Sequence, residues 1–385
     1  MRRSIVAFAA ALFLASGLGA QSTPPRGGSA SITPAALQEW LGYVASDDLQ
    51  GRALFSEGLD QAGSYIAEHL EAWGVKPGGE GGSYFQAVKI VGSKTGEGAS
   101  VERDAADPTS GTRFTRNVVG IVPGSDPALK DTYILFGAHY DHIGRTTDGS
   151  SVAKADLGDH PGRCPGQAPP TPRPGDTIYN GADDDGSGTV ALMALARAFA
   201  AGPRPKRSLV FVWHSGEETG LYGSRYYADY PVVPIDQTVA ELNIDMIGRN
   251  RCDLASEENT VYVVGADRIS TELHNLNEDA NAGLTKPMTL DYEYNDPADG
   301  EQLYTRSDHY SYASKGIPII FYTTGLHRDY HSVTDEVEKI DFPKLAHVTE
   351  LVYATAMKVG NLDHAPVRDN KGPRKGKGSS GRIEK

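Results

Sequence analysis

Cysteine is scarce in this chain of 385 residues, and its scarcity excludes two classes of protein. Cys164 and Cys252 are the only two cysteines. They are too few for a fold that depends on disulfides or for a metal site built from cysteine ligands. In an exported protein the two can pair, but the sequence leaves open whether they meet.

Positive charge is also in short supply. The chain has 37 Lys and Arg against 50 Asp and Glu, a formal net charge of −13, which argues against a nucleic-acid partner. The last stretch, 366–385, is basic and rich in Gly and Ser. This composition predicts a basic flexible tail, and a surface-binding arm is the alternative.

The first apolar run is too short to span a bilayer, which takes about 20 apolar residues. Arg2 and Arg3 precede it, and small residues follow as far as Ala20. This pattern predicts a signal peptide over 1–20, followed by a linker over 21–32. We therefore expect an exported protein, periplasmic or extracellular, without stable membrane insertion after cleavage.

The rest of the chain alternates between strand and helix patterns. Continuous apolar runs such as "YILFGA" and "LVFVW" are typical of strands buried on both faces. Thr33 and Pro34 are suited to begin the first helix. We find no internal repeat. The sequence predicts one globular α/β domain over 33–365, a mostly parallel mixed central sheet flanked by helices, interrupted by a Pro- and Gly-rich insertion over 145–178.

Acidic and imidazole side chains follow the predicted strands. His139 and Asp141 end one strand and Glu217 and Glu218 another, while Asp245 ends a third and His331 follows the last. Three aspartates, 183–185, begin a helix. Because ligands of open α/β sheets bind at the carboxyl ends of strands, we expect these groups to converge.

Two imidazoles and three carboxylates suit zinc, in two sites if one carboxylate bridges. The candidate metal ligands are His139, Asp183, Glu218, Asp245 and His331.

Ordinary helix capping is the alternative explanation for the aspartates. A calcium loop fits poorly, because Ala194 stands where its twelfth position requires Glu. Asp141 is placed to accept the second ring N–H of His139. The adjacent carboxylates Glu217 and Glu218 could divide the work, one binding metal and the other moving protons.

Five motifs in this order carry a family resemblance: "GAHYDH", "NGADDDGSG", "SGEETGLYGS", "NIDMIG" and "YHSVTDEVEKID". The chain resembles the di-zinc aminopeptidases of the secreted bacterial leucyl aminopeptidase type, whose wider relatives include glutamate carboxypeptidase II and the glutaminyl cyclases. "DDLQGR" and "RSDHYSYASKGIPIIFY" add to the likeness. The resemblance implies a zinc-exopeptidase-like fold, of the phosphorylase/hydrolase-like kind.

The resemblance also implies roles. His139 and Asp245 would bind one zinc ion, Glu218 and His331 the other, and Asp183 both. Glu217 would be the general base that activates a water held between the ions, with Asp141 behind His139 and Tyr304 stabilising the oxyanion. A non-proline cis peptide would join Asp183 to Asp184. The substrates would be peptides with a free N-terminus.

Three rival functions remain open at this point. A glutaminyl cyclase on the same fold uses one zinc, whereas five ligands are present here. A carboxypeptidase or aminoacylase of the related type needs an inserted lid domain, for which the spacing between Glu218 and Asp245 leaves little room. A non-catalytic binding protein would have lost Glu217 or a ligand, and neither is missing.

Overall fold

The computed structural model describes residues 27–91, 100–101, 112–146, 164, 166–168 and 170–384. The predicted signal peptide therefore lies outside the described residues, as do half of the linker and much of the insertion. No helix within the described ranges is both long and apolar enough to cross a membrane.

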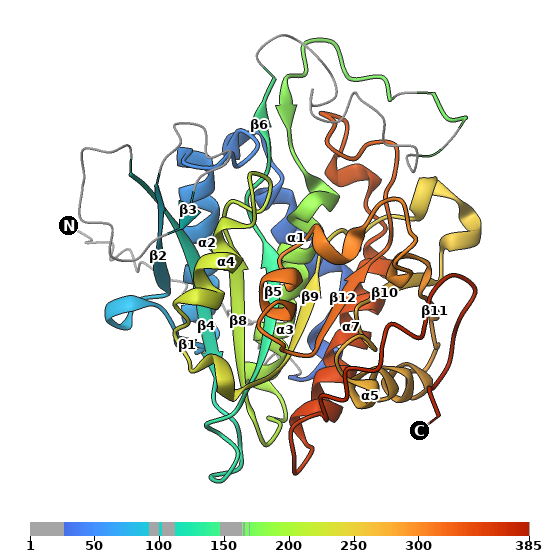
Figure 1. Ribbon diagram of the computed structural model, residues 1–385. Helices are drawn as coiled ribbons and strands as arrows, with labels where there is room; N and C mark the ends of the chain where they lie inside the picture. Colours follow the sequence, from blue (N-terminus) through green and yellow to red (C-terminus); the bar gives the residue numbers. More distant parts are fainter. Residues whose placement is uncertain are drawn as a thin grey trace, which may run out of the picture.

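The described helices and strands alternate along the chain, as the sequence predicts (Figure 1). The helices are α1 (Pro34–Val44), α2 (Glu57–Ala72), α3 (Gly188–Ala201), α4 (Tyr222–Asp229), α5 (Thr271–Ala282), α6 (His309–Ala313) and α7 (Phe342–Gly360). The strands are β1 (Lys76–Pro77), β2 (Phe85–Val91), β3 (Ser100–Val101), β4 (Arg113–Val122), β5 (Tyr133–His139), β6 (Gly144–Arg145), β7 (Ile178–Tyr179), β8 (Ser208–His214), β9 (Thr238–Ile244), β10 (Thr260–Val264), β11 (Thr289–Asp291) and β12 (Ile319–Thr323).

One large mixed sheet forms the centre of the domain, in the order β11-β10-β12-β9-β5-β8-β4-β2-β3, with β1 paired to β4. The four middle strands, β12, β9, β5 and β8, run parallel, and β10 and β11 form a further parallel pair. The other pairings in this sheet are antiparallel. The predicted α/β fold with a mixed sheet is confirmed, and its parallel part is the part that carries the site.

Helices cover both faces of this sheet. The largest apolar cluster joins one face to α1, α2, α3, α5 and α7, while α4 and α6 pack on the other face. Strand β8 is buried along its whole length, as expected for a continuous apolar run between two helical layers. Thr33 begins α1 as predicted, because its hydroxyl accepts the N–H of Ala36.

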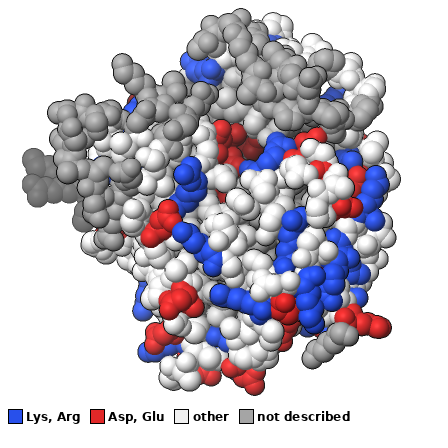
Figure 2. Space-filling view, in the orientation of Figure 1, with Lys and Arg blue, Asp and Glu red and all other residues white. Residues whose placement is uncertain are grey.

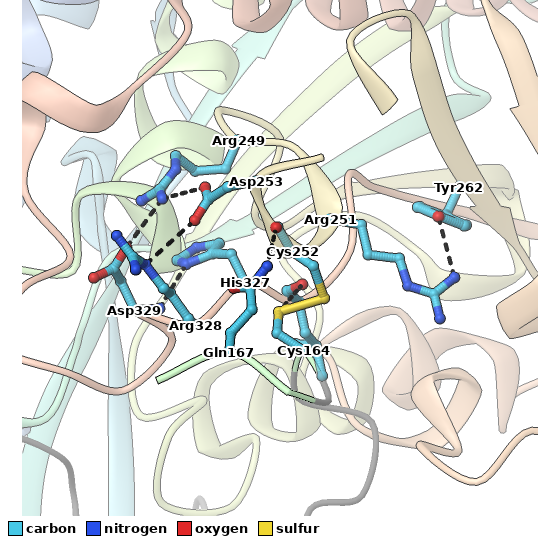
Figure 3. Close-up of a disulfide and its surroundings, with 11 residues drawn as sticks. Cys164, Gln167, Arg249, Arg251, Cys252, Asp253, Tyr262, His327, Arg328 and Asp329 are labelled. Carbon is cyan, nitrogen blue, oxygen red and sulfur yellow. Dashed lines mark hydrogen bonds and ion pairs between the residues drawn. A yellow bond between two sulfur atoms is a disulfide. The ribbon is translucent and has the colours of Figure 1, made fainter. Parts of the chain in front are cut away.

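A disulfide joins Cys164 of the insertion to Cys252, which settles the question of their pairing (Figure 3). The amide of Gln167 also donates to the Cys252 carbonyl, at 2.8 Å. Strands β6 and β7 pair antiparallel at the two ends of the insertion. The β6–β7 pairing thus holds the two ends of the insertion together, and the disulfide attaches it at Cys164 to the rest of the domain.

Residues 366–384, for which the sequence predicts a flexible tail, contain no helix or strand and lie against the body of the domain. The backbone N–H groups of Arg374 and Lys375 donate to the carboxylate of Asp267 at 2.6 and 2.7 Å. Further along, the Asn275 side chain on α5 bonds the backbone of Ile383.

Candidate metal centre

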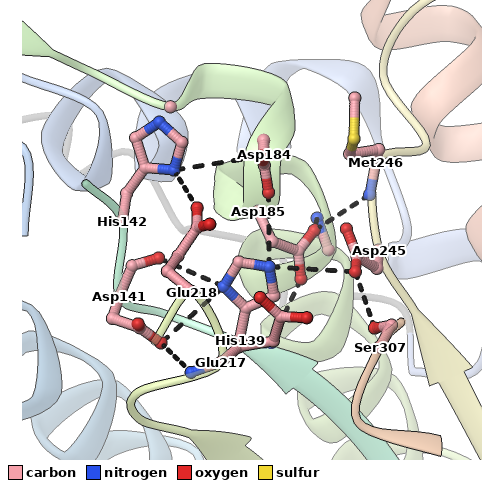
Figure 4. A network of polar contacts seen from close by, with 12 residues as sticks. His139, Asp141, His142, Asp184, Asp185, Glu217, Glu218, Asp245, Met246 and Ser307 are labelled. Atoms are coloured by element: carbon pink, nitrogen blue, oxygen red, sulfur yellow. Dashed lines mark hydrogen bonds and ion pairs between the residues drawn. The ribbon is translucent and has the colours of Figure 1, made fainter. Parts of the chain in front are cut away.

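The parallel strands deliver polar side chains to a single edge of the sheet (Figure 4). His139 is the last residue of β5, Asp245 directly follows β9, and Glu217 and Glu218 follow β8. His331 lies in the loop after β12. Since parallel strands end at the same edge, residues far apart in sequence converge there.

Two groups of side chains share one carboxylate, that of Asp184. In the first group, Nε2 of His139 lies 3.3 Å from Asp184 Oδ1 and 3.8 Å from Asp245 Oδ2. In the second, Nε2 of His331 lies 3.1 Å from Asp184 Oδ2 and 3.0 Å from Glu218 Oε2. The two oxygens of Asp184 therefore face different groups.

Asp183, the shared ligand expected from the sequence, points elsewhere. Its Oδ2 lies 3.2 Å from Nε2 of His327, and its Oδ1 accepts the N–H of Gly248 at 2.6 Å. The non-proline cis peptide is likewise one residue further on, at Asp184–Asp185 and not at Asp183–Asp184. Both expectations were wrong by one position, because three identical residues in a row do not reveal how the loop turns.

Asp185 holds the loop in place. Its Oδ1 accepts the N–H groups of Gly188 and Met246, and its Oδ2 accepts the N–H of His139. One buried carboxylate thus joins the beginning of α3 to the ends of β5 and β9. The three aspartates have three different tasks, and only Asp184 faces both groups.

Arg52, from the "DDLQGR" motif, holds the same loops from behind. Its fully buried guanidinium donates to four carbonyls, those of Val44, Tyr140, Asn180 and Gly181, at 2.7–3.0 Å. These bonds tie the segment after His139 to the segment before Asp184. The sequence showed the motif but not this function.

Asp141 lies behind His139, though its bonds differ from those expected. Nδ1 of His139 lies 3.1 Å from the backbone carbonyl of Asp141 and 3.7 Å from its carboxylate. The carboxylate instead accepts the backbone N–H of Glu217 at 3.2 Å. Asp141 therefore connects the candidate ligand His139 with the candidate base Glu217.

The structure does not bring Tyr304 to the cavity, which corrects the expected oxyanion role. The guanidinium of Arg268 stacks on its ring at 3.7 Å, and its carbonyl faces Nε2 of His309. Tyr330 lines the cavity, and its ring stacks on His331 with centroids 3.8 Å apart. Only its position beside His331 in the sequence could have drawn attention to it.

His142 is a further imidazole that the sequence did not single out. Its Nδ1 lies 2.6 Å from Glu218 Oε1 and 4.0 Å from Asp184 Oδ2, so His142, Asp184 and Glu218 also form a group able to hold an ion. Its second nitrogen is buried and has no hydrogen-bond partner among the described residues. Its position three residues after His139 was the available signal.

A small cavity opens over these groups. Its acidic side is formed by Asp184, Glu217, Glu218 and Asp245 beside His139. The remaining lining residues are Met246, Leu303, Arg306, Ser307, Phe321, Thr323, Leu326 and Tyr330. Figure 2 shows Asp and Glu side chains at the bottom of a recess on this face of the molecule.

Electrostatics favour positive charge in this cavity. Burial lowers the pKa of His139, but Glu217, Asp184 and Asp245 outweigh burial and hold that pKa well above its usual value. Burial raises the pKa of Glu218, but His331 and His142 outweigh it and hold the pKa at about 2. Burial, assisted by Glu218 and Asp245 and opposed by His139, raises the pKa of Glu217 well above its usual range.

The donor set fits zinc. It combines imidazole nitrogens with carboxylate oxygens, the ligand types of catalytic zinc. No Lys or Arg forms an ion pair with Asp184, Glu218 or Asp245 in the described part of the chain. Buried carboxylates without such partners are costly unless a cation balances them. Two groups that share Asp184, His139–Asp184–Asp245 and His142–Asp184–Glu218, can each hold an ion.

Comparisons with known proteins agree with this reading. Residues 117–356 match the model of peptidase family M28. A probable leucine aminopeptidase of Arthroderma benhamiae is 29% identical over 284 residues, which cover 71% of this chain and 64% of that protein. The chain thus spans less than two thirds of the length of this relative.

Solved structures share the fold. An aminopeptidase from Aneurinibacillus superimposes with a TM-score of 0.59 at 13% identity, over 91% of this chain and 99% of that one. The glutaminyl cyclase of Porphyromonas gingivalis gives 0.57 at 17% identity, over 84% and 97%. With most of the chain matched by the family model, and with buried imidazoles and carboxylates grouped at the sheet edge, this protein belongs to peptidase family M28.

Proposed function

We propose that this protein is an aminopeptidase that removes N-terminal residues from peptides and depends on two zinc ions. The observation that carries the proposal is Asp184, whose two oxygens face two separate groups of metal-ligand type beside Glu217. His139 and Asp245 would hold one ion, Glu218 and His331 the other, and Asp184 both. Zinc at such a site lowers the pKa of bound water and polarises a carbonyl.

The chain's own residues supply the remaining chemistry. Glu217 accepts a proton from the attacking water and passes it to the leaving amine. Asp141 holds the backbone of Glu217 in place. Ser307 donates to Asp245 at 2.7 Å and orients that ligand.

A free N-terminus fits this site. Its amine would bind one of the two ions, and the apolar residues Met246, Leu303, Phe321 and Leu326 surround a side chain. A peptide whose N-terminus is blocked offers no such amine. The name of the fungal relative, a probable leucine aminopeptidase, supports this choice.

The test is mass spectrometry of a peptide mixture incubated with the zinc-loaded protein, each peptide present both free and N-acetylated. We expect stepwise loss of N-terminal residues from the free peptides alone. Trimming from the C-terminus would contradict the proposal and indicate a carboxypeptidase. Cyclisation of N-terminal glutamine would indicate a glutaminyl cyclase, the function of one structural neighbour.

Metal analysis of the same preparation tests the number of ions. Two zinc ions per chain are expected, and a single ion that does not increase at saturation would contradict the shared role of Asp184.

We also propose that the protein is exported and that 1–20 is removed as a signal peptide. The disulfide between Cys164 and Cys252 supports an oxidising compartment. N-terminal sequencing of protein recovered from culture medium and periplasm tests this. An intact Met1 in protein confined to the cytoplasm would contradict it.

A further inference from the structure

The cavity holds one group that the proposed reaction does not use. Arg306 is the only Lys or Arg among the described residues that line it. In Figure 2, Lys or Arg side chains border the recess whose bottom is acidic. A guanidinium beside four carboxylates and several apolar residues calls for an explanation, because a site that binds only a terminal amine and an apolar side chain does not need one.

Arg306 stands next to both candidate metal groups. The following residue, Ser307, donates to Asp245 of the first group at 2.7 Å. Nη2 of Arg306 donates to the hydroxyl of Tyr330 at 3.3 Å, and Tyr330 stacks on His331 of the second group. A substrate held at the two groups therefore lies close to Arg306.

The guanidinium is held in a fixed position. Its Nη1 donates to the carboxylate of Glu301 at 2.8 Å and to the Glu301 carbonyl at 3.2 Å. The Glu301 side chain is only 7% exposed, whereas that of Arg306 is 30% exposed. A group oriented before the substrate arrives loses little freedom on binding it.

One edge of the guanidinium keeps donors to spare. Its Nε, and one of the two N–H bonds of Nη2, have no hydrogen-bond partner among the described residues. Nε and Nη2 form the edge that binds a carboxylate through two parallel hydrogen bonds. The cavity thus has the candidate metal ligands on one side and a donor edge for an anion, with apolar residues in the same lining.

We propose that Arg306 binds a carboxylate of the substrate and so determines specificity. This inference rests on the proposed aminopeptidase function. Two parts of a peptide supply that chemistry: the C-terminal carboxylate of a dipeptide, or the acidic side chain of an N-terminal residue. In the first case the enzyme prefers dipeptides, and in the second it prefers N-terminal Asp or Glu.

Four substrates separate these sources. Leu-Ala and its amide Leu-Ala-NH2 differ only in the C-terminal charge. Glu-Ala-NH2 and Gln-Ala-NH2 differ only in the charge of the first side chain. We expect kcat/KM of the wild type to favour the charged member of one pair roughly 10- to 100-fold, the size of a charge-assisted double hydrogen bond.

Arg306→Gln is expected to bring the favoured ratio close to 1 while leaving the other ratio unchanged. Arg306→Lys keeps the charge but loses the two-donor edge, so it should keep only part of the preference. This second variant keeps the test valid if the glutamine variant does not fold. Arg328→Gln is the matched control, since Arg328 belongs to the same loop as His331 but does not line the cavity.

The outcomes distinguish a failure of the Arg306 proposal from a failure of the proposed aminopeptidase function. Ratios near 1 for both pairs in the wild type, or an equal loss on all four substrates in Arg306→Gln, would overturn the role of Arg306 and leave the aminopeptidase in place. If the zinc-loaded wild type hydrolysed none of the four, the proposed function itself would fail, and the role of Arg306 with it.

Discussion

Nε2 of His139 lies 3.3 Å from a carboxylate oxygen of Asp184, and the neighbouring Asp183 instead faces His327. One position in a run of three aspartates separates a candidate ligand from a structural residue. The difference decides which variant should lose metal.

Asp184→Asn is expected to lower zinc affinity more than 100-fold, beyond the 10- to 100-fold typical of residues that only support a ligand. Asp183→Asn should lower it at most about tenfold, because Asn can still accept the N–H of Gly248. Competition of each protein with a fluorescent zinc chelator measures both affinities. The opposite ranking would restore Asp183 as the shared ligand.

Glu217→Gln should reduce kcat by roughly 10²- to 10⁴-fold, because glutamine cannot take the proton from water. Zinc content should stay that of the wild type, since Glu217 belongs to neither group able to hold an ion. Peptide hydrolysis and elemental analysis of one preparation check both points. Loss of zinc together with activity would show that Glu217 is needed to hold the metal and would leave its role as base unsupported.

Glu241 on β9 is completely buried, and neither carboxylate oxygen has a hydrogen-bond partner in the described structure. Burial and the charge of Asp308 raise its pKa well above the usual value. In the folded state Glu241 therefore keeps its proton at pH values at which the Glu241 carboxyl of the unfolded chain has already lost it. Stability should fall as pH rises from about 4.5, by at most about 1.4 kcal/mol per pH unit for this single group.

Glu241→Gln removes the titrating group and should flatten the pH dependence of the free energy of unfolding. The free energy of unfolding of the variant should therefore increase relative to that of the wild type from pH 5 to pH 8. Urea unfolding at several pH values in one zinc buffer measures this. The exposed Glu68→Gln serves as the control and should follow the wild type. A constant difference between Glu241→Gln and the wild type at all pH values would show that Glu241 does not titrate as described.

The disulfide closes a long loop, since Cys164 and Cys252 are 88 residues apart. Replacing both cysteines by serine should destabilise the protein by about 2–5 kcal/mol, chiefly by freeing the unfolded chain. Urea unfolding of the oxidised wild type and the double variant gives the difference. The wild type kept in reducing agent is the control and should match the variant.

The disulfide also bears on activity, because Sγ of Cys164 lies 4.0 Å from the carbonyl of Leu326, a residue of the cavity lining. We expect the double variant to change KM more than kcat, since the proposed base Glu217 follows a different strand, β8. Unchanged KM for every peptide would show that the insertion does not affect the cavity.

The sequence by itself determined the fold class and most of the residues of the candidate site. Buried apolar runs identified β5, β8 and β9, and the residues at their ends, His139, Glu217 and Asp245, lie where parallel strands must deliver them. These features are local, because strand patterns and the residue after a strand can be read from a short window. The order of the motifs then indicated the family.

The tertiary structure alone decided which aspartate faces both groups, since that depends on the path of the loop held by Arg52 and Asp185. It also decided that Tyr330 and Arg306 line the cavity while Tyr304 does not. These choices arise from contacts between segments far apart in the chain. No local pattern records them, because a side chain's direction is set by what packs against it.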